Sequence, residues 1–150
     1  QEIDKLALLF PSQPIAVDQV QQSIGDCSRH SLFDLGDALA ADAGRTLRIL
    51  DGLRAEGLKD IQSLVALARE ARQLEALARG QPVRLPARKQ ATASSHARRL
   101  GLPAIGAALA LAGRIDQAIK GMRPGDPASG NTALALRLAG APLAPPFEQL

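Results

Sequence analysis

The sequence predicts an all-α fold, a bundle of amphipathic helices, and three observations lead to it. Leucine recurs every three or four residues over most of the chain, as one face of an α-helix requires. Hydrophobic residues make up 46% and charged residues 22%, which is the balance of a folded chain. No stretch shows the alternating pattern of a half-buried strand. Aromatic residues are only 2%, so we expect a core of Leu, Ile, Val and Ala.

The N-terminal region predicts two short helical pieces. Glu2–Phe10 is typical of the last turns of a helix, and the two prolines in the turn after it must stop that helix. Asp18–Ile24 is the next expected helix, with Val20 and Ile24 on one face. A loop-like junction follows, and we place a domain boundary in it, after Asp26.

The centre of the predicted bundle is Ser31–Gly80, with three consecutive amphipathic helices. Asp42 can cap the middle helix through a side-chain oxygen, and Gly57 can supply the left-handed residue that ends it. Ser31-x-x-Asp34 has the form of a capping box for the first helix. The positions expected to face inward are Leu32, Leu35, Leu39, Leu47, Ile49, Leu50, Leu53, Ile61, Leu64, Leu67, Ala68, Ala71 and Leu74. Since no helix can bury its apolar stripe alone, the three should pack together.

Two further helices are expected in the C-terminal half. Gly80–Pro86 is a linker, and Leu102–Lys120 is a strong helix with Pro103 suited to its first turn. Gly121–Pro127 breaks the pattern, and the last helix spans about Gly130–Ala139. The expected inward positions are Leu102, Ile105, Leu109, Ala112, Ile115, Ile119, Leu134 and Leu138.

The stretch Arg84–Arg99 is basic and poor in large apolar residues. Lysine and arginine could meet phosphates there, because they release counterions from nucleic acid. A solvated charged helix explains the same residues and is the favoured interpretation. The net charge of +3 is mild, and aromatic platforms for stacked bases are nearly absent, which disfavours sequence-tolerant binding of single strands.

Glycine spacing at two places imitates a phosphate loop. Gly52–Gly57 and Gly101–Gly106 both have the G-x-x-x-x-G spacing, but neither is followed by the lysine and hydroxyl residue that bind phosphate and magnesium. We interpret these glycines as helix ends and close-packing positions. The sequence therefore predicts no nucleotide site and no other cofactor.

Metal-binding and catalytic groupings are equally incomplete. Cys27-x-x-His30 has the spacing of half a zinc site, but the other histidine, His96, lies in a different segment. A free thiol and a loop imidazole are the favoured interpretation. The carboxylates that could be cast as catalytic pairs are Asp34 with Asp37 and Glu70 with Glu75. Because arginines surround them, we expect a salt-bridged face and predict no catalytic residue.

Cysteine content and hydropathy limit the compartment in which the chain is expected and whether it spans a membrane. A single Cys excludes an internal disulfide framework and fits a reducing compartment. The longest weakly polar run, Leu102–Gly113, is shorter than the roughly 20 residues of a membrane span, so no membrane association is expected. The chain starts at Gln1 and not at Met, and we treat it as a piece of a longer polypeptide.

An ordered set of strings resembles the C-terminal part of the delta subunits of bacterial DNA polymerase III, the clamp-loader proteins that open the sliding clamp. They cover nearly the whole chain: Glu2–Phe10, Ser28–Leu39, Arg45–Gly57 (R-T-L-R-I-L-D-G-L-R-A-E-G), Leu64–Glu70, Arg114–Gly121, Asp126-Pro127 and Leu134–Gly140. One departure is Ala128–Asn131, where many relatives have a bulky aromatic and an acidic residue after Asp-Pro.

The resemblance implies a fold and a role. Gln1–Asp26 would be the end of a small helical lid of AAA+ type, and Cys27–Leu150 the helical collar domain. Collar domains of five subunits join into a ring, so this part would hold the clamp loader together without catalysis, as part of a non-catalytic subunit of a DNA-directed DNA polymerase holoenzyme. Implied partners are the ATPase subunits of gamma/tau type and delta-prime. The sliding clamp and DNA would be met by parts of the full-length protein outside this chain, in the bacterial cytoplasm.

A ring position requires two different interfaces on one domain. We expect charged outer faces of the two long helices to supply them, each contact burying about 1,200–2,000 Å². The residues expected at the subunit interface are Arg69, Arg72, Glu75, Arg114 and Asp116.

Two alternatives stay open from the residues. A helical nucleic-acid-binding regulator would use Asp42–Gly57 and the following helix as a helix-turn-helix, with Lys59, Asp60 and Gln62 as base-reading residues. A small helical enzyme or ligand-binding bundle would need convergent polar groups in the core, which the sequence does not show.

Overall fold

The computed structural model describes residue 32 and residues 34–143, and every regular element in this part of the chain is a helix. The all-α prediction is therefore confirmed at the level of fold class. The expected pieces Glu2–Phe10 and Asp18–Ile24, the boundary after Asp26 and the capping residue Ser31 lie outside the described residues.

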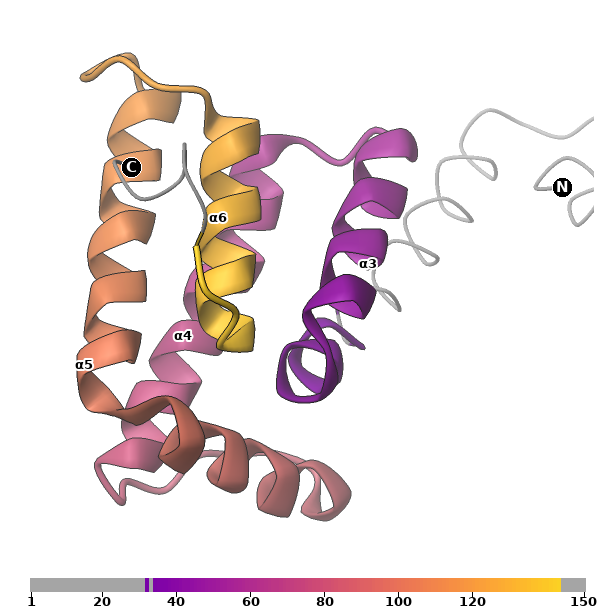
Figure 1. Ribbon diagram of the computed structural model, residues 1–150, viewed down its shortest axis with the longest axis vertical. Helices are drawn as coiled ribbons and strands as arrows, with labels where there is room; N and C mark the ends of the chain where they lie inside the picture. Colours follow the sequence, from indigo (N-terminus) through magenta and orange to yellow (C-terminus); the bar gives the residue numbers. More distant parts are fainter. Residues whose placement is uncertain (1–31, 33, 144–150) are drawn as a thin grey trace, which may run out of the picture.

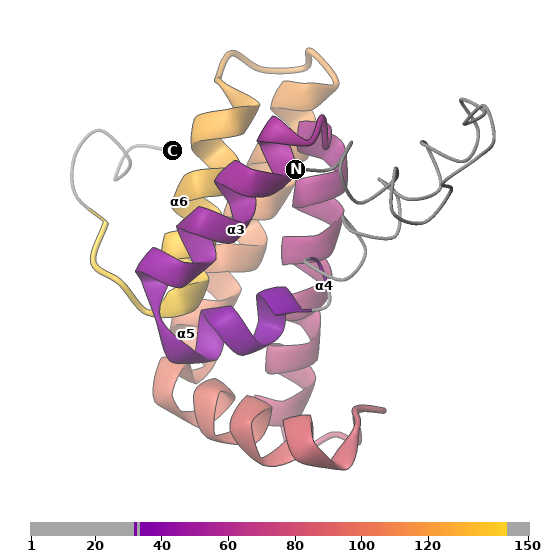
Figure 2. The same ribbon diagram turned by 90° about the vertical axis from the view of Figure 1, so that its right-hand side faces the viewer.

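Four helices follow the short helical stretch 34–41. They are α3 (Ala43–Ala55), α4 (Asp60–Ala78), α5 (Ala87–Ile119) and α6 (Pro127–Ala139). α4, the second part of α5 and α6 lie side by side, with α3 along one side of them (Figure 1). The stretch 34–41 crosses in front of α4 (Figure 2).

The ends of α3 are those that the sequence predicts. Both carboxylate oxygens of Asp42 accept backbone hydrogen bonds, from Gly44 at 3.1 Å and from Arg45 at 2.9 Å. These two bonds lower the pKa of Asp42, since they favour the ionised carboxylate. Gly57, with φ of 89°, follows the last turn, and residues 58 and 59 lead directly into α4.

α5 is two helices joined at Gly101. The backbone of Gly101 has φ 75° and ψ 156°, a combination reserved almost entirely for glycine. Pro103 then stands in the first turn of the second part, where its missing N–H leaves no hydrogen bond unmade. In Figure 1 the first part crosses the lower end of the bundle, while the second part runs up beside α4. The predicted helix Leu102–Lys120 is thus confirmed to within one residue.

The core is a single cluster of leucine, isoleucine and alanine side chains, as the composition predicts. Its largest fully buried hydrophobic members are Leu35, Leu39, Leu50, Leu67, Ile105, Leu111, Leu134 and Leu138. α4 packs most extensively on α5, and α6 touches α3, α4 and α5. α6 is therefore the central element, and all but its outer edge is buried.

Two polar contacts hold α6 in place. The guanidinium of Arg54 on α3 donates to the carbonyl of Ala128 at 2.6 Å and to the hydroxyl of Thr132 at 3.1 Å. The amide nitrogen of the fully buried Asn131 donates to the carbonyl of Asp60 at the start of α4, at 2.9 Å. Since a buried polar group left unpaired is costly, these bonds fix where α6 starts relative to α3 and α4.

Three expectations for the helices are wrong. Ile61 is 37% exposed and Leu102 is 40% exposed, so neither belongs to the inward stripe. Both stand in the first turn of a helix, at the rim of the bundle, where the neighbouring helices no longer cover the predicted face. The last helix begins at Pro127 and not at Gly130, because Asp126 caps it by accepting hydrogen bonds from the backbone of Ala128 and Ser129.

Candidate interaction surface

Two of the five residues expected at a subunit interface are paired within their own helix. Glu75 Oε1 lies 2.9 Å from Arg79 Nη2, and Asp116 Oδ2 lies 2.6 Å from Lys120 Nζ. Both are i,i+4 pairs on a helix surface, which contribute about 0.3–0.5 kcal/mol each. The charges of Glu75 and Asp116 are therefore partly matched before any partner arrives.

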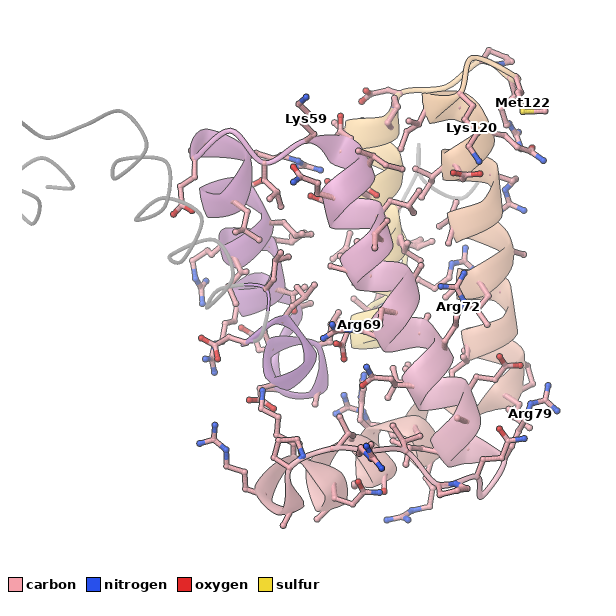
Figure 3. The ribbon with its side chains drawn as sticks, turned by 180° about the vertical axis from the view of Figure 1, so that it is seen from behind. Lys59, Arg69, Arg72, Arg79, Lys120 and Met122 are labelled. Carbon is pink, nitrogen blue, oxygen red and sulfur yellow. The ribbon has the colours of Figure 1, made fainter. Side chains whose placement is uncertain are left out.

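Arg69 and Arg72 stand on opposite edges of the outer face of α4. Figure 3 shows Arg69 on the side of the stretch 34–41 and Arg72 on the side of α5. The Arg69 side chain is 59% exposed, and its Nη2 lies 3.7 Å from Glu70 Oε1. Arg72 is exposed and has no ion pair within the described part of the chain. Arg72 is thus the cation on this face with the most to gain from an acidic partner.

Arg114 has a different setting. It is half-buried on the second part of α5 and lines a hollow of about 140 Å³ together with Arg123, where the loop leads into α6. Its Nε is buried and makes no hydrogen bond among the described residues. The five predicted residues therefore do not converge on one site but spread over α4 and the second part of α5.

An apolar groove opens along α4, on the edge where Arg69 stands. It has a volume of about 550 Å³, and the described residues that line it are Leu32, Ile61, Gln62, Val65, Ala66, Arg69 and Glu70. Val65 is 60% exposed although it is a large aliphatic side chain in the middle of a helix. This groove was not among the sites predicted from the sequence. The signal was present, since Ile61, Val65 and Arg69 follow one another at four-residue spacing on a second face of the helix.

Glu70 lines this groove, and its side chain is only 17% exposed. Its carboxylate presses on the stretch 34–41 so closely that a Cβ on Gly36 would lie 2.6 Å from Oε2. Burial raises the pKa of Glu70, and the nearby positive charge of Arg69 opposes that effect only in part. The expected salt bridges with arginine are present, at 3.7 Å between Glu70 and Arg69 and at 2.9 Å between Glu75 and Arg79, but the largely buried Glu70 side chain is not part of a solvated face.

The basic stretch 84–99 is not uniformly solvated. His96 is buried, and its Nε2 donates to the carbonyl of Leu138 at 2.9 Å. Its Nδ1 then serves as acceptor for the Arg99 guanidinium at 2.8 Å, and Arg99 also donates to the carbonyl of Ala40 at 3.1 Å. This chain of bonds joins the first part of α5 to α6 and to the stretch 34–41. Burial lowers the pKa of His96, and the charge of Arg99 lowers it further.

Several of the cations that could contact phosphate on this stretch are engaged within the chain. Lys89 forms an ion pair with Asp37 at 3.0 Å, and its side chain is largely buried. Four arginines on this stretch are exposed, and Arg99 among them is held by its bonds to His96 and Ala40, which leaves Arg84, Arg88 and Arg98. A patch of three arginines gives a small counterion-release term, so the geometry favours a structural role for the first part of α5.

The helix-turn-helix alternative gains no support from the start of α4. Gln62 Oε1 accepts a hydrogen bond from the backbone of Lys59 at 2.9 Å, so this side chain caps the helix. The carbonyl of Asp60 is occupied by Asn131. The first turn of α4 is thus tied to α6, and it offers the side chains of Lys59 and Asp60, of opposite charge, where a recognition helix needs several base-reading groups.

Within the described residues no group of three or more His, Cys, Asp and Glu side chains is arranged to hold a metal ion. Cys27 and His30 lie outside those residues, and His96 has both ring nitrogens engaged. Of the two glycine pairs that imitate phosphate loops, Gly57 follows the end of α3 and Gly101 forms the break in α5.

One described helix, α5, is long and apolar enough to cross a membrane by length and composition alone. The core helices of soluble proteins can be equally long and apolar. The break at Gly101 divides it, and its inner side packs against α4 and α6. The expectation that the chain has no membrane span stays a prediction.

Comparisons of this chain with protein-family models, with curated proteins and with solved structures find no match.

Proposed function

We propose that this chain is the C-terminal part of a clamp-loader delta subunit of bacterial DNA polymerase III. Gln1–Asp26 ends the AAA+-type lid, and Cys27–Leu150 forms the collar domain. The collar holds the five-subunit clamp loader together, so that the full-length protein can open the sliding clamp and load it onto DNA during replication. The chain needs no cofactor and catalyses no reaction, and it works in the bacterial cytoplasm beside the ATPase subunits and delta-prime.

The agreement between the strings that resemble this family and the ends of the helices supports the proposal. The string Arg45–Gly57 begins two residues inside α3 and stops at the glycine that follows this helix. Arg114–Gly121 ends with α5 and its terminal glycine, and Leu134–Gly140 ends with α6 and its left-handed C-cap. Leu64–Glu70 lies inside α4 and does not end with it, so this agreement is carried by the other three strings.

The surface suits a subunit that is held on more than one side. Ring membership needs two different interfaces on one domain. The chain offers a charged face around Arg72 on one edge of α4 and an apolar groove on the other edge. In the proposed ring, Arg69, Arg72, Glu75, Arg114 and Asp116 contribute to contacts with neighbouring collar domains. Arginine is among the residues that carry most binding energy at such interfaces.

A charge reversal at Arg72 tests this proposal. The complex of this chain with the clamp-loader ATPase subunit and delta-prime is titrated, and we expect Arg72→Glu to weaken assembly about tenfold or more. Arg88→Glu is the matched control, because it makes the same change of charge at another exposed position. Circular dichroism melting verifies that both variants fold. If Arg72→Glu assembles as tightly as Arg88→Glu and the unchanged chain, this face is not a subunit interface.

A further inference from the structure

We propose that the hollow between the end of α5 and the start of α6 binds a carboxylate group, supplied by a glutamate or aspartate side chain of a neighbouring subunit. The hollow lies at the end of the bundle where the loop after α5 leads into α6 (Figure 1). The binding site follows from the described residues alone, whereas the source of the carboxylate rests on the proposed function.

One face of α5 forms a wall of this hollow. The residues that line it from α5, at three- and four-residue spacing, are Leu111, Arg114, Ile115 and Ala118. The start of α6 and the loop lie close against this face. A Cβ on Gly130 would lie 2.8 Å from Ile115 Cγ1, and a Cβ on Gly125 would lie 3.6 Å from Ala118 Cβ. Tight packing therefore fixes the hollow, and its volume of about 140 Å³ exceeds that of several waters at about 30 Å³ each.

Two arginines line this hollow without a partner of their own. Arg114 and Arg123 form no ion pair and no hydrogen bond among the described residues, although Arg114 Nε is buried. Arg54 Nε is equally buried, but that guanidinium donates through Nη2 to Ala128. A buried donor left without an acceptor lowers stability. The planar fork of an arginine matches the two oxygens of a carboxylate, so a carboxylate in the hollow would satisfy it.

The charge of the hollow matches one carboxylate. Arg114 and Arg123 contribute two positive charges, and Asp126 contributes one negative charge. The hydroxyl and the backbone N–H of Ser129 donate to Asp126, which lowers the pKa of Asp126 and keeps it ionised. Two positive charges less one negative leave +1, which a singly charged carboxylate neutralises. A phosphate dianion would instead leave an excess of negative charge beside Asp126.

The apolar part of the lining favours a carboxylate that is carried on a side chain. The side chains of Leu111, Ile115, Ala118 and Pro124 offer no hydrogen bond to the additional oxygens of a phosphate, but they can contact methylene groups. Residues 32–143 contain 16 basic and 10 acidic residues, a net charge of +6, which favours encounter with an acidic partner. Glutamate and aspartate combine a methylene stem with a single negative charge.

The side-chain Nε–H resonance of Arg114 tests the site in the full chain, alone in solution. The probe is N-acetyl-glutamate α-amide, which carries one side-chain carboxylate, and it is titrated at constant ionic strength. We expect a saturable shift of this resonance with a dissociation constant on the order of 1–10 mM, as for a small ligand held by few contacts. The neutral N-acetyl-glutamine α-amide should cause no such shift.

Arg123→Gln should weaken binding of the probe about tenfold, since it removes one of the two charged donors. Arg123 is exposed in a loop, so this variant keeps the core intact. Arg88→Gln is the matched control at an exposed position of α5 and should leave the affinity unchanged. The site is rejected if Arg114 shows no saturable shift, if the Arg88 resonance shifts as much, or if Arg123→Gln binds the probe as tightly. Tighter binding of inorganic phosphate than of the probe rejects the assignment to a carboxylate.

Assembly tests the source of the carboxylate. In the complex with the ATPase subunit and delta-prime, Arg123→Glu should weaken assembly about tenfold or more, and Arg88→Glu should not. If the probe binds but Arg123→Glu leaves assembly intact, the neighbouring subunit does not supply the carboxylate. A chain that assembles but does not bind the probe rejects the site and leaves the proposed function standing. A chain that binds the probe but does not assemble contradicts the proposed function and leaves the site standing.

Discussion

Replacing Gly101 with alanine tests whether α5 is broken at this residue. A broken helix and a continuous one predict opposite changes in the free energy of unfolding. At φ 75° and ψ 156° an alanine is strained, and such strain costs about 1–3 kcal/mol. Space does not contribute, because the nearest atom to an added Cβ is Pro103 Cδ at 3.8 Å. In an uninterrupted helix the same substitution would instead stabilise the fold by about 1 kcal/mol, since alanine is the better helix former.

The assay is urea unfolding followed by circular dichroism, with the free energy of unfolding obtained by linear extrapolation. Gly106→Ala and Gly113→Ala are matched controls, because both lie in the second part of α5 and an added Cβ there meets no atom within 4 Å. We expect both to raise the free energy of unfolding by up to about 1 kcal/mol, while Gly101→Ala lowers it. If Gly101→Ala stabilises the chain like the two controls, the break in α5 is not a property of the folded protein.

Two predictions concern pH. Because the pKa of His96 is lowered from its ordinary value of 6.5, the unfolded chain takes up a proton first as the pH falls; the stability that neutral His96 provides is present above about pH 6.5 and lost below it. Urea unfolding at pH 7.5 and 5.5 should show this loss, and His96→Gln should be less stable at pH 7.5 but show a smaller loss on acidification. The raised pKa of Glu70 gives stability the opposite dependence on pH. The free energy of unfolding falls as the pH rises through the folded-state pKa, because the buried carboxyl group must then ionise. Glu70→Gln should raise the free energy of unfolding at pH 7, and this gain should vanish below pH 4.5, so a gain that persists there contradicts the assignment.

Helix periodicity predicted the bundle well where packing agrees with it. Leu50, Leu67 and Leu134 are buried on the faces that the three-to-four-residue spacing indicates. Asp42 and Gly57 define the end regions of α3 because capping and left-handed geometry depend on residue type alone. Local chemistry of this kind is readable from sequence.

Long-range contacts could not be read in this way. Ile61 fits the stripe of α4, but its exposure depends on which neighbouring helix reaches the first turn. His96 stood among arginines in the sequence, and its bond to Leu138 arises only because α6 returns to that point. The groove beside Val65 depends on where Leu32 lies relative to α4, which no spacing within α4 specifies.

Native mass spectrometry tests the central claim most directly. The chain is mixed with the clamp-loader ATPase subunit and delta-prime, and the copy number in the assembled species is read from its mass. The proposed collar role predicts a complex that contains one copy of this chain, because each ring position is filled by one collar domain. A chain that stays monomeric while its partners assemble with one another would contradict that role.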